Sequence, residues 1–455
     1  MSDLMTAVAC LADKRAPYDL LWRYYEGHQP LRYSTERLRE VFRDFKVHFA
    51  ENWCSTVVDV CTDRINLSGF KVENGPGDTD RLTELFGSLE LGLTSDDVHL
   101  ASLVCGESML IVWPKKDGTP GAYYNDPRMV HVEYDAEDPS IIAWAGKWWM
   151  PSDKHLLLNL YYEDRVERYQ STKEGDTQTA RKAFAQIDEI PNKYGRVPVF
   201  HFRRTRTSLS SELANILSLQ DATNKLLSDM MVAAEYGAFP QRWAISTGDV
   251  SQLKNSPNKI WEIPAADGIS QASQVGQFEP AKLDSYLLAM NDFAQKIAII
   301  SRTPKHYLML QGGDPSGEAL YAMEAPLTRK LGRYVERFSS PWRQAASFVL
   351  LIDGRDVPAE KIEPLFDPVQ TMQPLTSVQV ANQKLPLGVS KAQVKRELGY
   401  TDSQIEDMDI ETAEEQEAMG DAMLAAFDKG QERLSTKDEN TDQNAEEDTG
   451  EDTEE

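Results

Sequence analysis

Residues 211–240 read SELANILSLQDATNKLLSDMMVAAEYGAFP, in which apolar and polar side chains each repeat at helical spacing. Apolar side chains recur along it at helical spacing until Pro240, which cannot continue a helix. The apolar stripe consists of Leu219, Ala222, Leu226, Met230 and Ala233. A polar stripe of Asp221, Lys225 and Asp229 repeats every four residues. The pattern predicts one helix over residues 211–237, about 40 Å long at 1.5 Å per residue.

A second helix is predicted over residues 281–300. Its apolar face consists of Leu283, Tyr286, Leu287, Met290, Ala294 and Ile297. Residues 239–280 lie between the two helices and are rich in turns, with strand-like pieces at 241–245 and 260–263. Two helices joined through so small an insert indicate an antiparallel pair with a small domain at its tip. The polar stripe on the first helix is typical of a helix that forms part of a wall with one face exposed to solvent.

The residues before this pair divide into a helical part and a β-rich part. Helical spacing begins after Ser34, a candidate N-cap, and continues to Ile65, and residues 78–105 are helical again. An extended stretch at 69–72 separates the two. Alternation and short apolar runs over residues 108–202, with a hairpin signal at Asp117-Gly118, predict a small antiparallel sheet or barrel.

A third helix is predicted from Ser316 to Leu351. Pro326 and Pro341 lie inside it, so we expect it to kink or break there. Residues 353–430 contain short helical pieces, one of them capped by Ser390 and another beginning at Asp402. A chain of 455 residues is too long for one compact core. We therefore expect several structural regions of an α+β fold that is mainly helical.

The net charge of −25 is concentrated at the C-terminus. Residues 401–455 hold 21 acidic and three basic residues, a net charge of −18, which leaves the other 400 residues at only −7. From about residue 435 no apolar residue larger than alanine occurs. Such a segment cannot bury enough surface to offset its ordering entropy, so residues 431–455 are predicted to be disordered.

The sequence offers no convincing catalytic or metal-binding set. It contains no phosphate-loop, nucleophile-elbow or zinc-protease motif, no cofactor is expected, and the seven histidines are scattered. The glycine-rich run 312–317 could hold an anion, and the acidic pairs 96–97 and 163–164 a metal, but a flexible loop and solvated charges explain them better. The four cysteines suit small core positions in a reducing compartment. No apolar run approaches a membrane span, and the N-terminus does not resemble a signal peptide.

Two basic groups remain, residues 201–206 (HFRRTR) and the set Arg302, Lys305 and His306. A solvated surface charge set is the default interpretation of each, and contact with DNA phosphate is the alternative.

The order of the predicted elements and several short sequence motifs resemble those of the portal proteins of long-tailed, siphophage-type bacteriophages. Four stretches carry the resemblance: 21–31 (LWRYYEGHQPL), 52–59 (NWCSTVVD), 211–213 through 235–243 (SEL to EYGAFPQRW), and 300–308 (ISRTPKHYL) with 316–319 (SGEA). Each is moderately specific, but their common order over three hundred residues is a strong signal.

The resemblance implies a ring-forming subunit with the phage portal fold. The implied regions are a wing at 1–205, a first stem helix at 206–238, a clip at 239–280, a second stem helix at 281–300, a tunnel loop at 301–317, a long kinked wing helix at 318–352 and a crown at 353–430. The implied protein is not an enzyme. It forms a ring, dodecameric in the family, at one capsid vertex, through which DNA is packaged and ejected, and it nucleates procapsid assembly.

The resemblance also implies partners and places. Double-stranded DNA passes through the channel, the terminase large subunit and a head–tail connector dock on the ring, and major capsid and scaffolding proteins surround it, in the virion and, during assembly, in the host cytoplasm. Candidate DNA-channel residues are Arg302, Lys305, His306, Tyr307 and Gln311. Candidate clip residues for docking are Gln241, Arg242, Trp243, Lys254, Lys259 and Trp261. Candidates for the polar face of the stem are Asp221, Lys225 and Asp229.

Three other classes of protein stay open at this point. An enzyme acting on nucleic acid would need clustered carboxylates or histidines in a cleft. A monomeric or small-oligomer adaptor with an acidic tail would lack ring assembly. Another phage head component, such as a scaffold or minor capsid protein, would lack the order of helix, small insert and helix.

Overall fold

A computed structural model describes residues 2–30, 32, 51–151, 155–175, 183–238, 242–245, 274–279, 282–308, 316–370, 383–398, 400, 405–406 and 408–420. The chain divides into two compact units, Met1–Thr371 and Met372–Glu455. The predicted helical residues 34–49, residue 402 and the predicted disordered tail lie outside the described residues.

Helices of the first unit contribute to one main hydrophobic core. They are α1 (Asp3–Tyr25), α3 (Trp53–Thr62), α4 (Pro76–Ser88), α5 (Leu91–Cys105) and α9 (Gly317–Ile352). α9 supplies Phe338, Trp342 and Phe348 to the main core, where each is fully buried. Cys54 and Cys61 face the same core from α3 as free thiols, which confirms the interpretation of these cysteines as small core residues.

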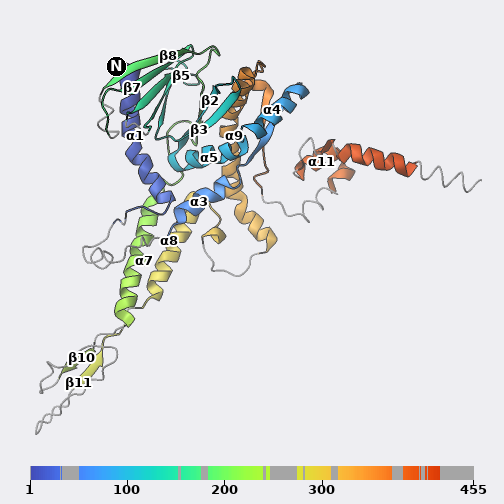
Figure 1. Ribbon diagram of the computed structural model, residues 1–455. Helices are drawn as coiled ribbons and strands as arrows, with labels where there is room; N and C mark the ends of the chain where they lie inside the picture. Colours follow the sequence, from blue (N-terminus) through green and yellow to red (C-terminus); the bar gives the residue numbers. More distant parts are fainter. Residues whose placement is uncertain are drawn as a thin grey trace, which may run out of the picture. The chain divides into compact units, whose positions relative to one another are not determined.

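The predicted β-rich region forms two antiparallel sheets rather than one barrel (Figure 1). In the first sheet β2 (Glu107–Pro114) lies between β3 (Pro120–Asn125) and β9 (Val199–Arg203). The second has the order β4 (Val130–Tyr134), β5 (Ile142–Trp149), β6 (Leu157–Tyr161), β7 (Arg165–Ser171) and β8 (Phe184–Pro191). The expected hairpin at Asp117-Gly118 joins β2 to β3, with Gly118 at φ +85°.

A small third sheet, of two strands, joins residues that the sequence had assigned to different regions. Strand β1 (Leu67–Val72), at the predicted extended stretch, pairs antiparallel with β12 (Ile362–Phe366), which follows the short helix η2 (Ala359–Lys361). The register places Phe70 opposite Pro364. Residues 353–366, assigned by the sequence to the crown, therefore fold with the first unit, and the division between units lies after residue 371 instead of residue 352. Strand partners so distant in sequence leave no local signal.

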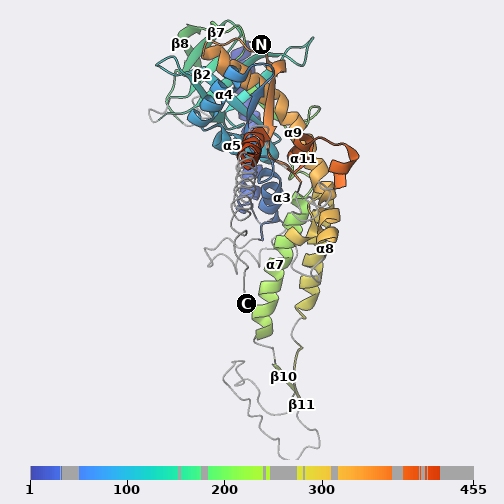
Figure 2. The same ribbon diagram turned by 90° about the vertical axis from the view of Figure 1, so that its right-hand side faces the viewer.

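The two helices predicted around the insert are present and lie side by side as α7 (Leu217–Ala238) and α8 (Asp284–Ser301) (Figures 1 and 2). At their far end β10 (Arg242–Ile245) pairs antiparallel with β11 (Gln274–Gln277). α7 begins six residues later than predicted. Residues 212–216 form turns instead, because the amide of Glu212 donates to Leu103 and that of Leu213 to the Ser211 hydroxyl.

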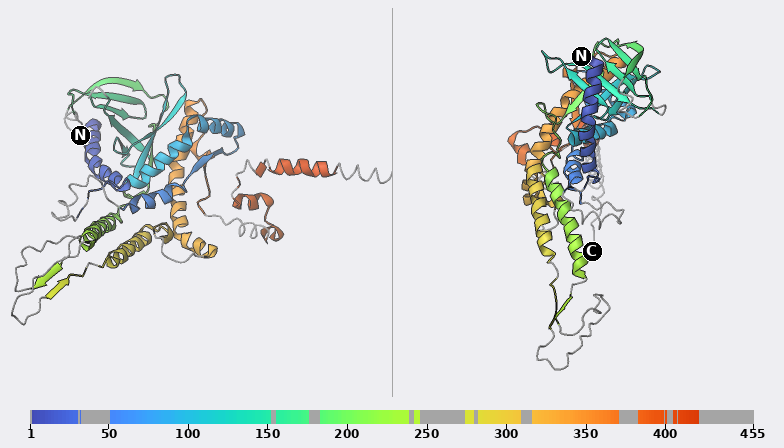
Figure 3. Two further views of the ribbon diagram at one scale, coloured as in Figure 1. Left: turned by 60° about the horizontal axis from the view of Figure 1, so that its bottom comes forward. Right: turned by 90° about the vertical axis from the view of Figure 1, so that its left-hand side faces the viewer.

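The third predicted helix is continuous through both prolines. Ser316 caps it, accepting a hydrogen bond from the amide of Ala319, and its first turns lie at an angle to the rest (Figures 1 and 3). The bend lies toward the Pro326 end of α9, as expected where a proline removes a backbone hydrogen bond.

The second unit is described in short pieces. They are η3 (Leu385–Leu387), α11 (Lys391–Glu397) and helical residues at 408–420. Ser390 caps α11 as predicted, accepting a hydrogen bond from the amide of Gln393.

Candidate functional site at the base of the helix pair

The loop after α8 contains most of the predicted channel residues. Arg302 ends α8 in the left-handed conformation, at φ +58°, and Lys305–Tyr307 form the short helix η1. The side chains of Arg302 and Lys305 are exposed. Gln311 lies outside the described residues. The structure thus leaves two of the candidates open to an anion.

His306 and Tyr307 are held against other elements. Arg64, after α3, forms an ion pair of 3.1 Å with Glu324 of α9 and donates to the Tyr307 hydroxyl at 2.6 Å. That hydroxyl donates to Glu324 at 3.3 Å, and Nε2 of His306 lies 3.6 Å from the same carboxylate. These contacts fasten η1 to α3 and α9.

A buried ionic network lies beside this loop and joins three segments. Nζ of Lys330, on α9, donates to Glu212 at 2.9 Å and to the carbonyl of Ser301 at 2.7 Å. The other oxygen of Glu212 pairs with Arg204 at 3.0 Å and accepts from the Tyr334 hydroxyl at 2.5 Å. Because a buried carboxylate is costly unless paired and hydrogen-bonded, this network fixes the end of α8 and the start of α7 on α9.

A hollow of about 230 Å³ opens at the network. Arg302, Arg333 and Arg337 line it beside the network residues Arg204, Glu212 and Lys330. The sequence had singled out Arg302 here, but not the two arginines of α9, which are four residues apart on one helix face.

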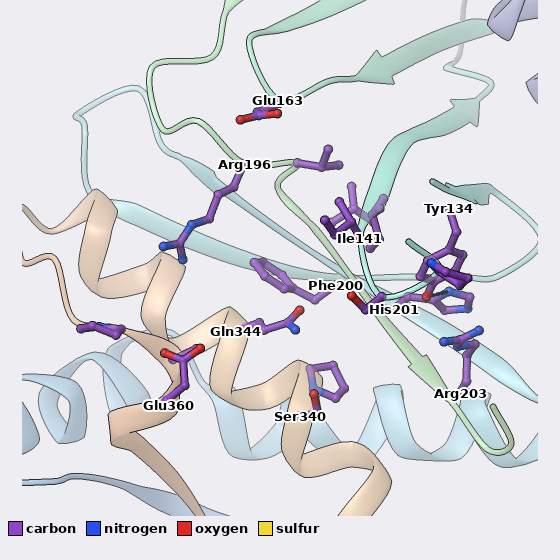
Figure 4. Close-up of a pocket in the computed structure, with 18 of the residues that line it drawn as sticks. Tyr134, Ile141, Glu163, Arg196, Phe200, His201, Arg203, Ser340, Gln344 and Glu360 are labelled. Atoms are coloured by element: carbon purple, nitrogen blue, oxygen red, sulfur yellow. Dashed lines mark hydrogen bonds between the residues drawn. The ribbon is translucent and has the colours of Figure 1, made fainter. Parts of the chain in front are cut away.

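A larger groove of about 980 Å³ lies between the β-sheets and α9, and Arg337 lines it as well. Figure 4 shows Tyr134, His201 and Arg203 grouped at one end, and Glu163 and Arg196 from the sheet side with Glu360 opposite. Its charges are nearly balanced, because four arginines face three carboxylates.

The basic run 201–206 is mostly structural. Nε2 of His201 lies 2.7 Å from Glu107, which also pairs with Lys14 at 3.0 Å. Burial opposes ionisation of Glu107, but Lys14 and His201 outweigh it and hold the pKa of this carboxyl below its usual range. The Arg203 guanidinium lies over the Tyr134 ring at 4.6 Å. The default expectation of a solvated charge set is therefore corrected for His201, whose side chain is only 4% exposed.

The polar stripe of α7 divides. Lys225 and Asp229 pair with each other and are partly exposed. Asp221 is only 4% exposed and accepts hydrogen bonds of 2.8 and 2.9 Å from the Tyr24 hydroxyl of α1. The expectation that Asp221 lines a wet wall is thus corrected for the single chain, since α1 covers it.

Two further polar residues of α7 bind the chain before α3. The Gln220 amide donates to the carbonyl of Glu51 at 2.6 Å and accepts from the Trp53 amide at 3.0 Å, and Asn224 accepts from the Glu51 amide at 2.9 Å. Sequence reasoning missed this contact. The four-residue spacing of Gln220, Asn224 and Ser228, all buried, was its only signal.

Of the predicted clip residues, Arg242 and Trp243 lie on β10. The Trp243 ring covers Gly276 of β11, where an added Cβ would meet the ring at 2.5 Å. Gln241, Lys254, Lys259 and Trp261 lie outside the described residues.

Within the residues that the structure describes, no group of three or more His, Cys, Asp or Glu side chains could hold a metal ion. The helices in that part of the chain include none long and apolar enough to cross a membrane.

Fold and site define a mixed α+β subunit that carries a helix pair with a β-ribbon at its tip, fixed at its base by buried ion pairs. The chain belongs to the family Phage portal protein, SPP1 Gp6-like, whose model matches residues 8–420. This confirms the resemblance found in the sequence and the predicted fold class, and it identifies a structural protein rather than an enzyme.

Individual relatives are distant. The portal protein of Mycobacterium phage D29 is 25% identical over 254 residues, covering 52% of each chain. That of Mycobacterium phage L5 is 24% identical over 261 residues, covering 54% of each. The chain thus aligns with about half the length of these curated relatives.

Solved structures of similar fold come from a gene transfer agent particle. The neck of the empty particle, computed with C6 symmetry, has a TM-score of 0.46 at 13% identity and covers 80% of this chain and 94% of that one. The neck of the native particle, computed with C12 symmetry, has a TM-score of 0.44 at 13% identity and covers 81% and 95%.

Proposed function

We propose that copies of this chain assemble into a portal ring at one vertex of a phage capsid, through which DNA is packaged and later ejected. Membership of the phage portal family over residues 8–420 supports this function. The ring, a dodecamer in our proposal, belongs to the virion and is built in the host cytoplasm.

The helix pair carries the proposal. On α8, Leu287 is 48% exposed and Leu288 is 70% exposed, although both lie in an amphipathic helix that already packs on α7. Apolar surface of this kind is stabilised when it leaves water. A ring of subunits would cover these leucines with the helix pair of the next copy.

The regions then take distinct roles in the proposal. α7 and α8 form the stem, and the β10–β11 ribbon belongs to the clip, where Arg242 and Trp243 are candidates for docking the terminase large subunit and later a head–tail connector. Capsid and scaffolding proteins contact the outer parts of the ring.

Contact with DNA should be weak. Lys305 stays a candidate because it is exposed and does not line the hollow beside α8, whereas Arg302, also exposed, does line it. A few such cations give salt-dependent contacts to phosphate without gripping the duplex. A body with a net charge of only −7 outside residues 401–455 is consistent with a channel that must let DNA slide.

The mass of the purified protein in solution tests the proposal. We expect light scattering to give an assembly of very large mass, or a monomer that converts to it on concentration. A monomer or small oligomer of 51.3 kDa subunits at every concentration would instead support an adaptor with an acidic tail.

A further inference from the structure

We propose that the hollow beside the end of α8 is a socket for a carboxylate of a second copy of this chain. The inference rests on the proposed ring, and it assigns a partner and a chemistry to one side of the contact between copies. Three observations support it: uncompensated charge, neighbouring apolar surface and a source of carboxylates in the same sequence.

The hollow has a large excess of positive charge. Five cations line it, and Glu212 is the one carboxylate among its described lining residues. Glu212 is already neutralised by Lys330 and Arg204. The remaining charge belongs to Arg302, Arg333 and Arg337.

None of these three arginines has a carboxylate partner in the part of the chain that the structure describes. Arg333 donates to the carbonyl of Arg329 at 3.4 Å, and Arg337 donates to the carbonyl of Arg204. A carbonyl accepts a hydrogen bond but does not cancel a full charge. Because a guanidinium presents donors in a planar fork that matches a carboxylate, the hollow is suited to an incoming Asp or Glu side chain.

Apolar surface beside the hollow distinguishes a protein partner from a nucleic acid. Ile299 is 76% exposed, and Ile300, which lines the hollow, is 46% exposed. Arginine next to exposed aliphatic side chains is typical of protein–protein contacts, whereas a DNA backbone offers polar and charged groups that leave such isoleucines in water. The observations therefore favour a second protein chain.

The same chain can supply the carboxylate. Asp63, Asp96 and Asp97 are exposed at the end of α3 and on α5. Partial desolvation and then the like charges of Asp97 and Asp63 raise the pKa of Asp96, so this exposed acidic group would gain from a cation. Copies in a ring meet through two different faces, so one chain can carry both the cationic and the acidic partner.

Charge reversal at an exposed arginine tests the socket. Arg333→Glu should raise the protein concentration needed for half-maximal ring assembly by about tenfold, which corresponds to about 1.4 kcal/mol. Arg343→Glu is the matched control, because Arg343 is an exposed arginine of the same helix that does not line the hollow. Circular dichroism of both variants shows whether each still folds.

Zero-length coupling then identifies the partner. Rings of Arg333→Lys are assembled from mixed ¹⁴N- and ¹⁵N-labelled copies, treated with a carbodiimide and digested for mass spectrometry. We expect the introduced lysine to form an amide with an Asp or Glu of the differently labelled copy. Coupling confined to one copy, in rings that do assemble, would overturn the inference.

The two proposals fail separately. Wild-type protein that never forms rings contradicts the proposed function and the socket with it. Rings in which Arg333→Glu assembles like wild type contradict the socket alone. If that variant assembles normally but retains a short DNA duplex less well at low salt, the hollow is a nucleic-acid site and our assignment is wrong.

Discussion

His99 is buried in the main core, and each of its ring nitrogens has a partner. Nδ1 donates to the carbonyl of Ile65 at 2.9 Å, and Nε2 accepts from the Trp342 indole at 3.0 Å, while the ring stacks on Phe338 at 4.9 Å. Because burial disfavours the charged imidazolium, it lowers the pKa of His99 from 6.5 to about 4.

This shift predicts a fold that weakens in mild acid. The unfolded histidine takes up a proton below about pH 6.5, whereas the folded one does so only near pH 4. The free energy of unfolding is therefore unaffected by protonation of this histidine above about pH 6.5. It falls as the pH drops from 6.5 toward 4, by about 3 kcal/mol in all, because only the unfolded state gains the proton. In urea unfolding, His99→Gln should start from a lower stability but show a flatter pH dependence in this window. Equal slopes for variant and wild type would contradict the assignment.

Two glycines with positive φ allow a matched comparison. A Cβ added to Gly106, at φ +91°, would meet the backbone of Ser210 at 2.8 Å, whereas one added to Gly118, at φ +85°, would meet nothing within 4 Å. Gly118→Ala should cost about 1 kcal/mol from backbone strain alone. Gly106→Ala should cost clearly more, since the loop leading to α7 must move. Thermal unfolding of both variants measures the difference, and equal losses would show that the close approach does not matter.

Residue roles that depend on local sequence could be predicted, and those that depend on distant partners could not. The cap at Ser390 follows from side chain and position alone. Asp221 was predicted to be exposed to solvent. The sequence of α7 contains no signal that Tyr24, 197 residues away, covers this side chain. Arg333 and Arg337 were missed for the same reason, since only the fold brings α9 to the end of α8.

At the scale of elements, periodicity predicted most helices and the β-rich region, including the two helices of the α7–α8 pair. Periodicity could not predict which strands pair with each other. Strand β12 was assigned to the crown because its partner β1 lies nearly three hundred residues earlier. α7 began late because a tertiary hydrogen bond from the Glu212 amide to Leu103 and a local one from the Leu213 amide to Ser211 replace the first helical turn.

We predict that the exposed apolar face of α8 is needed for ring assembly. Leu288→Asp should leave the subunit folded, because the side chain is already 70% exposed, but should prevent or strongly weaken ring assembly. Ile187→Asp is the control, since Ile187 of β8 is 55% exposed and outside the helix pair. Size-exclusion chromatography with light scattering compares the two. Equal assembly of both variants would show that the contact between copies does not use this face of α8.

At the scale of the whole molecule, the charge distribution is compatible with the proposed passage of DNA, although the chain as a whole is acidic. Most of the net charge of −25 belongs to residues 401–455, outside the stem and the loop after α8. The rest is nearly balanced, and its buried charges join elements, as Glu212 and Lys330 do at the base of the α7–α8 pair. What stays exposed there is a small cationic surface, which we assign to a neighbouring copy.

Electron microscopy of the purified protein shows whether copies of this chain form a ring. Under assembly conditions we expect class averages of rings with a central hole, in which each subunit contributes one α7–α8 pair to the wall of the channel. A persistent population of compact monomers, with no rings at any concentration tested, would contradict the account.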